Sequence, residues 1–188
     1  MAEQRPVVAV LFGGRSNEHA ISCLSAAGVL SAIDRFKYDV VAVGISKSGQ
    51  WHIFDGEPEE LSIRNGELPQ APKAGTQVRM SLDPALRGFV AVDGKTLPEI
   101  YSQIDVVFPV MHGPYGEDGT IQGALEFADL PCVGSGVFAS SAAMDKTHMK
   151  AMLGSHKLPI GAYEAVTSQQ WLHHKSATLK RLEGLGLP

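Results

Sequence analysis

A continuous apolar run near the N-terminus constrains the fold of this chain more than any other feature. The run "PVVAVLF" covers residues 6–12, is rich in valine and shows no polar alternation. Such a run is typical of a strand buried on both faces, as in a parallel sheet. The turn "GGRSN" follows, and we expect Ser16 or Asn17 to be the N-cap of a helix.

The segment after this turn predicts a helix and then a second strand. In "EHAISCLSAAGVLSAI" a helical period places Ile21, Leu24 and Ala27 or Gly28 on one face, which Leu30 and Ile33 broadly continue. The run "YDVVAVGIS" at 38–46 predicts another buried strand. Strand, glycine turn, helix and strand form a βαβ unit, which favours a right-handed crossover between parallel strands.

The middle of the chain gives a weaker pattern. Between residues 47 and 97, Gly, Pro and isolated hydrophobic residues predict short hairpins and loops on the surface, outside the core. The run "IDVVFPVM" at 104–111 resumes the buried-strand pattern. A helix is expected over "GTIQGALEFADL", stopped by Pro131, and a short strand over "PCVGSG".

The C-terminal part is expected to be mainly helical. "VFASSAAMDKTHMKAMLGSHK" predicts two helices broken near Asp145, and "LPIGAYEAV" predicts a strand. "SQQWLHHKSATLKRLEGLGLP" predicts one amphipathic helix ended by Gly184 and Gly186. A strand is expected to follow "GLGLP", so we interpret the end at Pro188 as a truncation.

Composition and charge exclude several classes of protein. Hydrophobic residues make up 44% and charged residues 19% of the 188 residues, which is enough for a packed core. The formal net charge is −4 with no Lys/Arg block, which argues against a nucleic-acid partner. No apolar run is long enough to cross a membrane, and no signal-peptide pattern is present, so a cytoplasmic protein is expected. Cys23 and Cys132 lie in apolar segments and are expected to be reduced core thiols, with no metal-ligand spacing.

Glu18 is the first candidate for a functional residue. In open α/β sheets ligands bind at the carboxyl ends of the strands, where glycine turns lead into helices. The turn before Glu18 fits neither the G-x-G-x-x-G pattern nor a P-loop, and a carboxylate there would repel phosphate. Glu18 could simply complement the helix dipole, or it could bind a cation such as a substrate ammonium group.

His112 is the second candidate. It ends the apolar strand at the start of "HGPYGEDGT", and Gly113 allows close approach of the backbone to a ligand. One interpretation is a hydrogen-bonded structural histidine, and the other is a ligand for a carboxylate. Glu18 for an ammonium and His112 for a carboxylate would together fit an amino acid. Glu117 and Asp118 are expected to order the turn and cap the next helix.

Three motifs resemble one family. "GGRSNEHAIS" and "HGPYGEDGTIQGALE" closely resemble the two N-terminal signatures of D-alanine–D-alanine ligases, members of the ATP-grasp superfamily. "VGSGVFASSAAMDK" resembles the segment that enters the central domain of that family. The likeness runs over nearly the whole chain, and its motifs stand in the order of the family.

The resemblance implies a reaction and roles for four residues. ATP would phosphorylate one D-alanine, the amine of a second would attack the acyl phosphate, and Mg²⁺ would neutralise the phosphates, in peptidoglycan synthesis. By motif match, Glu18 would hold and orient the amino group of the first D-alanine, and Ile21 would line the same pocket. His112 would lie near the reacting carboxylate and stabilise developing charge. Lys146 would contact ATP, although its residue pattern alone indicates a solvated helix lysine.

The resemblance also implies the domain organisation. A Rossmann-like parallel-sheet domain is expected over residues 1–145, followed at 146–188 by the beginning of an ATP-grasp central domain. The family's further lysine, glycine-rich loop, oxyanion-binding arginine and acidic magnesium ligands are not in this sequence. The chain by itself is therefore expected not to catalyse ligation. A homodimer is implied by the family alone.

Three alternatives stay open at the level of the sequence. The chain could be a non-catalytic amino-acid-binding or dimerisation module. It could be a nucleotide-binding Rossmann module, although the G-x-G-x-x-G pattern is missing. It could also be part of a relative that joins D-alanine to D-lactate or D-serine, because the residues that choose the second substrate lie in the missing part.

Overall fold

The structure is a computed structural model that describes residues 5–186. It divides into two compact units, of which the first ends at Met144 and the second begins at Asp145. The first unit is an α/β unit built on one six-stranded sheet. In chain order its elements are β1 (Val7–Gly13), α1 (His19–Ala32), β2 (Asp39–Ile45), β3 (Trp51–Phe54), the 3-10 turn η1 (Pro58–Leu61), β4 (Gln77–Met80), β5 (Phe89–Ala91), the 3-10 turn η2 (Glu99–Tyr101), β6 (Val106–Pro109), α2 (Thr120–Phe127) and α3 (Val137–Met144).

The sheet combines parallel and antiparallel strands in the order β5-β4-β3-β2-β1-β6. β1 pairs in parallel with both β2 and β6, which confirms the βαβ unit and the two buried strands predicted from the apolar runs. β3, β4 and β5 are added by antiparallel pairing beyond β2. The outcome is a Rossmann-like parallel centre with an antiparallel extension on one side.

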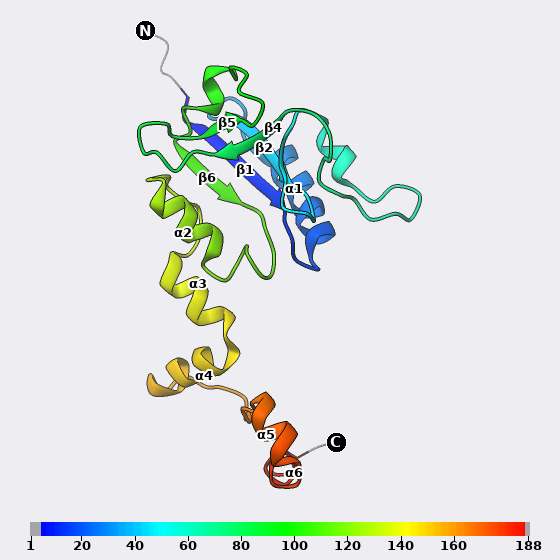
Figure 1. The fold of residues 1–188 in the computed structure, drawn as a ribbon, viewed down its shortest axis with the longest axis vertical. Coiled ribbons are helices and arrows are strands. Elements are labelled where there is room, and N and C mark those ends of the chain that lie inside the picture. Colours follow the sequence, from blue (N-terminus) through cyan, green and yellow to red (C-terminus); the bar gives the residue numbers. More distant parts are fainter. Residues whose placement is uncertain (1–4, 187–188) are drawn as a thin grey trace. The chain divides into compact units, whose positions relative to one another are not determined.

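The connectivity places the carboxyl ends of β1 and β6 side by side. From β1 the chain crosses to β2 on one side, and it later returns to form β6 on the other side of β1 (Figure 1). This reversal is a topological switch point, the position where open α/β sheets bind their ligands. The segments that follow β1 and β6 contain Glu18 and His112, respectively.

The sheet has a hydrophobic cluster on each face. Along β1, Val7, Ala9 and Leu11 point to one face, where the core includes Ile121 and Leu125 of α2. The alternate residues, among them Val10 and Phe12, point to the other face, where α1 packs. Both faces of β1 are buried, which explains why its sequence shows no polar alternation.

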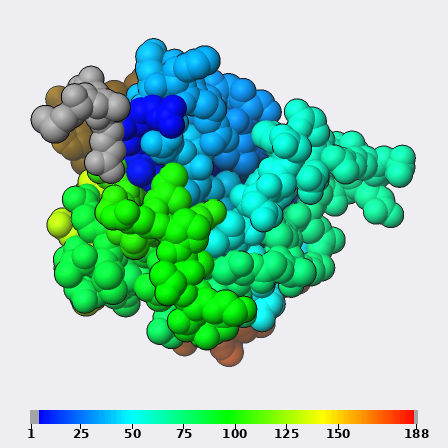
Figure 2. Space-filling view, turned by 90° about the horizontal axis from the view of Figure 1, so that it is seen from above, coloured from blue at the N-terminus to red at the C-terminus, as the bar shows by residue number. Residues whose placement is uncertain are grey.

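The segment 47–97 is more than the surface elaboration that we predicted. Its strands β3–β5 extend the sheet, and Val78 and Phe89 are buried in the core on the α2 face. Leu61 and Ala71 are buried on the α1 face. The prediction was wrong because strands of three or four residues are too short to show a period. Part of the segment, cyan to teal in Figure 2, projects as a lobe from the surface.

The face that helix α1 presents to the sheet agrees only in part with the predicted one, since Ala27 and Leu30 are buried as predicted and Ile21 is not. Its buried residues are His19, Ser22, Cys23, Ala26, Ala27 and Leu30. Ile21 is 51% exposed, so its predicted place on the core face was wrong. The buried face is made mostly of small side chains, and small side chains allow a helix to lie close to the sheet. A hydrophobicity pattern gives more weight to Ile21 and Leu24 and therefore selects a face that is only partly right.

The start of α1 also differs from the prediction. Glu18, and neither Ser16 nor Asn17, occupies the N-cap position, and it makes no side-chain capping bond. The Ser16 hydroxyl oxygen accepts the Glu18 backbone N–H at 3.1 Å, one residue before the helix. Because Glu18 does not cap the helix with its own carboxylate, that carboxylate is left for other contacts.

The end of α2, the segment after it and the two cysteines follow the predictions in part. α2 ends at Phe127, before Pro131, in a turn where Asp129 has a φ of +54°. The expected strand at "PCVGSG" is reduced to one parallel bridge between Cys132 and Val107. Cys23 is a buried thiol as predicted, and burial raises its pKa to about 12. Cys132 is only half-buried.

The second unit contains three helices, α4 (Lys146–Ser155), α5 (Ser168–His173) and α6 (Lys175–Glu183). The predicted break near Asp145 is confirmed, because its carboxylate caps α4 and accepts the N–H groups of Thr147 and His148. The strand predicted over "LPIGAYEAV" was wrong, since residues 158–166 form neither strand nor helix. The single helix predicted next is two helices interrupted at His174, and Gly184 is the C-cap of the second.

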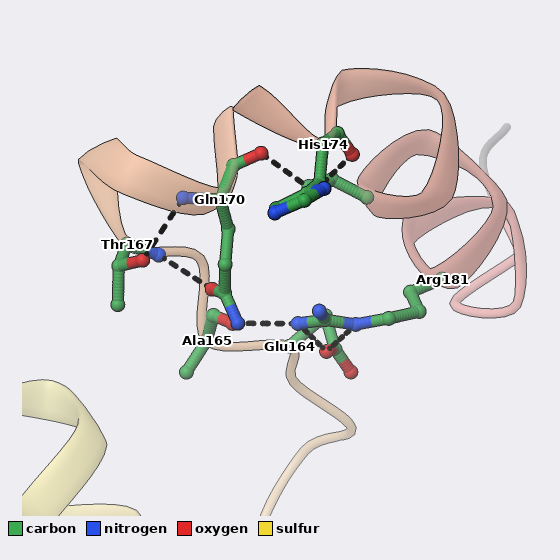
Figure 3. A network of polar contacts seen from close by, with 7 residues as sticks. Glu164, Ala165, Thr167, Gln170, His174 and Arg181 are labelled. Atoms are coloured by element: carbon green, nitrogen blue, oxygen red, sulfur yellow. Dashed lines mark hydrogen bonds and ion pairs between the residues drawn. The ribbon is translucent and has the colours of Figure 1, made fainter. Parts of the chain in front are cut away.

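Polar contacts, more than a hydrophobic core, organise the end of the second unit (Figure 3). Thr167 and Gln170 form a reciprocal capping box at the start of α5. Arg181 forms an ion pair with Glu164 and donates to the Ala165 carbonyl at 2.9 Å. Among the described residues of this unit only Thr178 is buried, and its hydroxyl donates to the His174 carbonyl.

Gly13 gives a test of the turn after β1. Its φ is +86°, and a Cβ there would overlap the Ile45 carbonyl oxygen and come within 2.9 Å of the Ala71 Cβ. We expect Gly13→Ala to lower the free energy of unfolding by about 1–3 kcal/mol from the backbone strain alone, and by more from the overlap. Urea unfolding followed by circular dichroism measures this loss.

Gly28→Ala is the matched control on α1. A Cβ at Gly28 would meet no atom within 4 Å, and the residue has helical surroundings. We expect this substitution to stabilise the protein by up to about 1 kcal/mol, through helix propensity. Equal effects of the two substitutions would contradict the packing described for the Gly13 turn.

Candidate substrate-binding site

The turn after β1 is shaped by two consecutive glycines. Gly13 and Gly14 have φ values of +86° and +95°, which favour glycine. The Gly14 N–H donates to the Ile45 carbonyl at 2.7 Å and so joins this turn to the end of β2. The chain then turns from the sheet into α1, and Ser16 and Glu18 follow at the carboxyl end of the strand.

Three serines join this segment to the end of β6. The Ser22 hydroxyl donates to the Val110 carbonyl at 2.5 Å and accepts the Gly13 N–H at 2.7 Å. The Ser16 hydroxyl donates to the His112 carbonyl at 2.7 Å. Ser25 Oγ lies 2.9 Å from His112 Nε2. Residues 16–25 therefore hold both the backbone and the side chain of the segment 110–112.

The carboxylate of Glu18 lies beside the second turn. A Cβ built on Gly113 would be 3.2 Å from Glu18 Oε2, so the carboxylate oxygen is close to the Gly113 backbone. Gly113 has a φ of +71°. Glycine at this position therefore serves the local backbone and also leaves room for the Glu18 carboxylate. Glu18 is exposed, so its carboxylate is accessible to a ligand.

His112 is half-buried and adjoins a cavity of about 400 Å³. The cavity is lined by residues around the end of β6 and the start of α3, including Gly116, Glu117, Gln122, Ser135 and Ser140. Ser25 contacts Nε2 of the His112 ring, and among the described residues no hydrogen bond reaches the other ring nitrogen, Nδ1. The sequence-predicted pair, Glu18 and His112, thus lies on two turns joined by direct contacts.

The two acidic residues after His112 order the second turn, as predicted. Glu117 Oε2 accepts the Gly113 N–H at 2.6 Å. Asp118 accepts the N–H groups of Tyr115 and Thr120 and so satisfies the start of α2. Burial raises the pKa of the Asp118 carboxyl, but these hydrogen bonds outweigh it and the net pKa lies below its usual range.

Arg15 and Tyr115 form a further link between the two turns. The guanidinium carbon of Arg15 lies 4.7 Å from the centroid of the Tyr115 ring, which is cation–π geometry. Tyr115 has a φ of +71°, a conformation that a non-glycine residue rarely adopts. Strained backbone of this kind is concentrated at functional sites.

His19 connects the first turn to the 47–97 segment. The residue is 1% exposed. Its Nε2 accepts the Ala71 N–H at 3.0 Å, so in the neutral ring Nδ1 carries the proton and donates to the Gly14 carbonyl at 2.7 Å. Burial lowers the pKa of His19 below 6.5, although the bond to Gly14 acts in the opposite direction.

The two other predicted site residues are exposed. Ile21 lies one helical turn after Glu18, on the same side of α1, which is the position a lining residue of this site would need. Lys146 is the first residue of α4 and belongs to the second unit. Within residues 5–186, Lys146 forms no ion pair.

Sequence reasoning missed the serines and the Arg15–Tyr115 pair. Ser22 and Ser25 lie four and seven residues after Glu18, so a helical period places all three on one side of α1. That spacing is the signal that could have found the serines. Nothing in the sequence pairs Arg15 with Tyr115, because the two residues meet only through the parallel pairing of β1 with β6.

A comparison with protein families shows to which family the chain belongs. The family described as "D-ala D-ala ligase N-terminus" matches residues 7–135, which include both turns of the site. The chain belongs to the D-alanine–D-alanine ligase family. The resemblance found in the two glycine-containing motifs is thereby confirmed.

Relatives within the family match the whole chain closely. The D-alanine–D-alanine ligase of Paenarthrobacter aurescens (strain TC1) is 46% identical over 184 residues, which is 98% of this chain and 49% of that protein. The ligase of Mycobacterium avium (strain 104) is 47% identical over 188 residues, which is 100% of this chain and 50% of that protein. The chain spans about half the length of the curated relatives it matches, the N-terminal half.

Solved structures of family members share the fold. The VanG D-Ala:D-Ser ligase from Enterococcus faecalis matches with a TM-score of 0.75 and 29% identity, covering 96% of this chain and 49% of that one. The D-alanine–D-alanine ligase from Coxiella burnetii matches with a TM-score of 0.74 and 26% identity, covering 95% and 50%.

Two kinds of feature are absent from residues 5–186. No helix in this part of the chain is long and apolar enough to cross a membrane. In the same residues, no three or more His, Cys, Asp or Glu side chains are grouped in a way that could hold a metal ion.

Ser22→Ala tests the link between β1, α1 and β6. The substitution removes the hydroxyl that pairs with the Gly13 N–H and the Val110 carbonyl, and Ser22 is fully buried. We expect the free energy of unfolding to fall by about 1–3 kcal/mol, the cost of leaving a buried polar group unpaired. Ser31→Ala, at an exposed position of α1, should change it by less than about 0.5 kcal/mol.

His19 predicts a pH dependence of stability. Because the folded pKa lies below the unfolded value, the unfolded chain binds the proton more tightly. The contribution of neutral His19 to the free energy of unfolding is complete above about pH 6.5 and is lost progressively as the pH falls below that value. Urea unfolding between pH 5 and pH 7.5 should show a steeper loss for wild type than for His19→Gln, which cannot titrate. Parallel curves would contradict the buried neutral state of His19.

Proposed function

We propose that this chain supplies the binding site for the first D-alanine of a D-alanine–D-alanine ligase. The observation that carries the proposal is the approach of the Glu18 carboxylate to Gly113, the residue after His112, at the carboxyl ends of β1 and β6. A carboxylate and an imidazole on adjoining turns suit the ammonium and carboxylate groups of an amino acid. Membership of the family supports D-alanine as that amino acid.

Each residue has a distinct task in this proposal. The exposed Glu18 carboxylate accepts hydrogen bonds from the substrate ammonium and fixes its orientation. His112 donates a hydrogen bond to the substrate carboxylate and stabilises the charge that develops there during reaction. Ile21 covers the methyl side of the substrate from the same face of α1. Gly113, which has no Cβ, leaves room for the Glu18 carboxylate.

The remaining steps of the reaction require a nucleotide. In the whole ligase, ATP would convert the first carboxylate to an acyl phosphate, and the amine of the second substrate would displace phosphate to form the dipeptide for peptidoglycan. Lys146 would contact ATP. Residues 5–186 contain no group of three or more His, Cys, Asp or Glu side chains that could hold Mg²⁺.

The domain roles and assembly extend the same proposal. We assign substrate binding to the first unit and the beginning of an ATP-grasp central domain to the second. We also propose a cytoplasmic homodimer, on the basis of the family alone. The second substrate is a separate question, and the match to a D-Ala:D-Ser ligase is compatible with an acceptor other than D-alanine.

Kinetics of His112→Ala test the proposal. The protein is expressed from its native gene and assayed for dipeptide and phosphate release with D-alanine, ATP and Mg²⁺. Loss of a hydrogen bond to a charged substrate group should lower kcat/KM for D-alanine by about tenfold to hundredfold. We expect a higher KM for D-alanine together with a lower kcat, and a similar loss of kcat/KM for Glu18→Gln.

Glu126→Gln is the matched control for the loss of a carboxylate. Glu126 is exposed on α2 and has no contact with Glu18 or His112. The control should keep wild-type kinetics. Wild-type kinetics in both His112→Ala and Glu18→Gln would overturn the assigned roles, and absence of D-alanine-dependent phosphate release from the native protein would overturn the function.

A further inference from the structure

The contact between Ser25 and His112 has no part in the function proposed above. Ser25 is a half-buried residue of α1, and His112 follows β6. The Ser25 hydroxyl oxygen lies 2.9 Å from His112 Nε2, within hydrogen-bond distance. The two residues are 87 positions apart in the sequence, so only the fold brings them together.

The surroundings of His112 leave one ring nitrogen for a ligand. Its backbone carbonyl accepts the Ser16 hydroxyl, which fixes the position of the residue. Its Nε2 is occupied by Ser25. Nδ1 has no hydrogen-bond partner within residues 5–186, and His112 is one of the residues that line the cavity of about 400 Å³. A ligand in this cavity could form a hydrogen bond with the ring through Nδ1.

We propose that Ser25 is a positioning residue that sets both the rotation and the tautomer of the His112 ring. Its hydroxyl donates to Nε2, so the neutral ring carries its proton on Nδ1. The Nδ1–H then donates to the substrate carboxylate. The hydrogen bond to one ring nitrogen determines which nitrogen carries the proton. The χ2 torsion of histidine has broad energy minima, so a contact to the ring is needed to fix its rotation.

The inference deepens the proposed function, and it rests on that function only for the identity of the ligand carboxylate. The state of the ring itself is a property of this chain without substrate. A measurement of the tautomer therefore tests Ser25 even where D-alanine does not bind. A separate measurement with D-alanine tests the ligand.

Two-bond proton–nitrogen correlation spectra of the ¹⁵N-labelled chain test the positioning role. In its neutral form, the wild-type His112 ring should be mainly the Nδ1–H tautomer. Ser25→Ala should lose this preference, and Ser25→Thr, which keeps a hydroxyl, should retain it. Ser31→Ala, on the same helix and exposed, should match wild type.

Two results would overturn the inference. One is a wild-type ring that is mainly the Nε2–H tautomer. The other is an unchanged tautomer in Ser25→Ala. If Ser25→Ala fails to fold, Ser25→Cys replaces it, because a thiol of similar shape is a much weaker donor and should also lose the Nδ1–H preference.

Titration with D-alanine separates the two proposals. A shift of the His112 resonances that weakens in Ser25→Ala supports both. Failure of D-alanine to shift His112, with the tautomer changes intact, counts against the proposed ligand and leaves Ser25 confirmed as a positioning residue. In the complete ligase Ser25→Ala should lower kcat/KM for D-alanine by about threefold to tenfold, with rescue by Ser25→Thr.

Discussion

The Ser22 hydroxyl is the interaction on which the rest of the first unit depends. It lies fully buried between α1 and the sheet, and it satisfies the Gly13 N–H and the Val110 carbonyl at the same time. These two groups lie at the ends of the neighbouring strands β1 and β6, beyond the last backbone pairing between the two strands. Because a serine hydroxyl can donate and accept together, one side chain fixes the helix to both strand ends. The turns that contain Glu18 and His112 begin on either side of this contact.

The sequence predicts the centre of this fold better than its margins. β1 and β2 are recognisable because burial on both faces produces unbroken apolar runs. The edge strand β6 also has an apolar run, although only Val107 of its four residues is fully buried. The added strands β3–β5 have only three or four residues each, which is too few for such a pattern. The face of α1 was misassigned in part because small residues such as Ser22 and Ala26 pack against the sheet, while the larger Ile21 is exposed. Residues 158–166 resemble a strand locally but form neither strand nor helix.

The candidate site was partly predictable for similar reasons. Glu18 and His112 stand directly after strands that could be recognised, and the position of a residue at a strand end is itself informative. To predict Ser25 as a site residue, one must know which side of α1 faces β6. To predict the Arg15–Tyr115 pair, one must know the tertiary arrangement, since their contact joins two turns that are far apart in the chain. Polar contacts between distant segments leave no period in a sequence, so such residues are accessible only from the structure.

The large sequence separation of the serine contacts has a consequence for the order of folding. The bonds from Ser16, Ser22 and Ser25 to residues 110–112 close loops of 87 to 96 residues. Contacts between distant parts of a chain form slowly, because the entropy of loop closure is lost before they contribute any stability. The βαβ unit can form from local contacts, while the two turns of the site meet only after the whole 47–97 segment has been passed and β6 has docked. Glu18 and His112 therefore come together only in the native topology, and a partly folded chain carries the two residues without carrying the site.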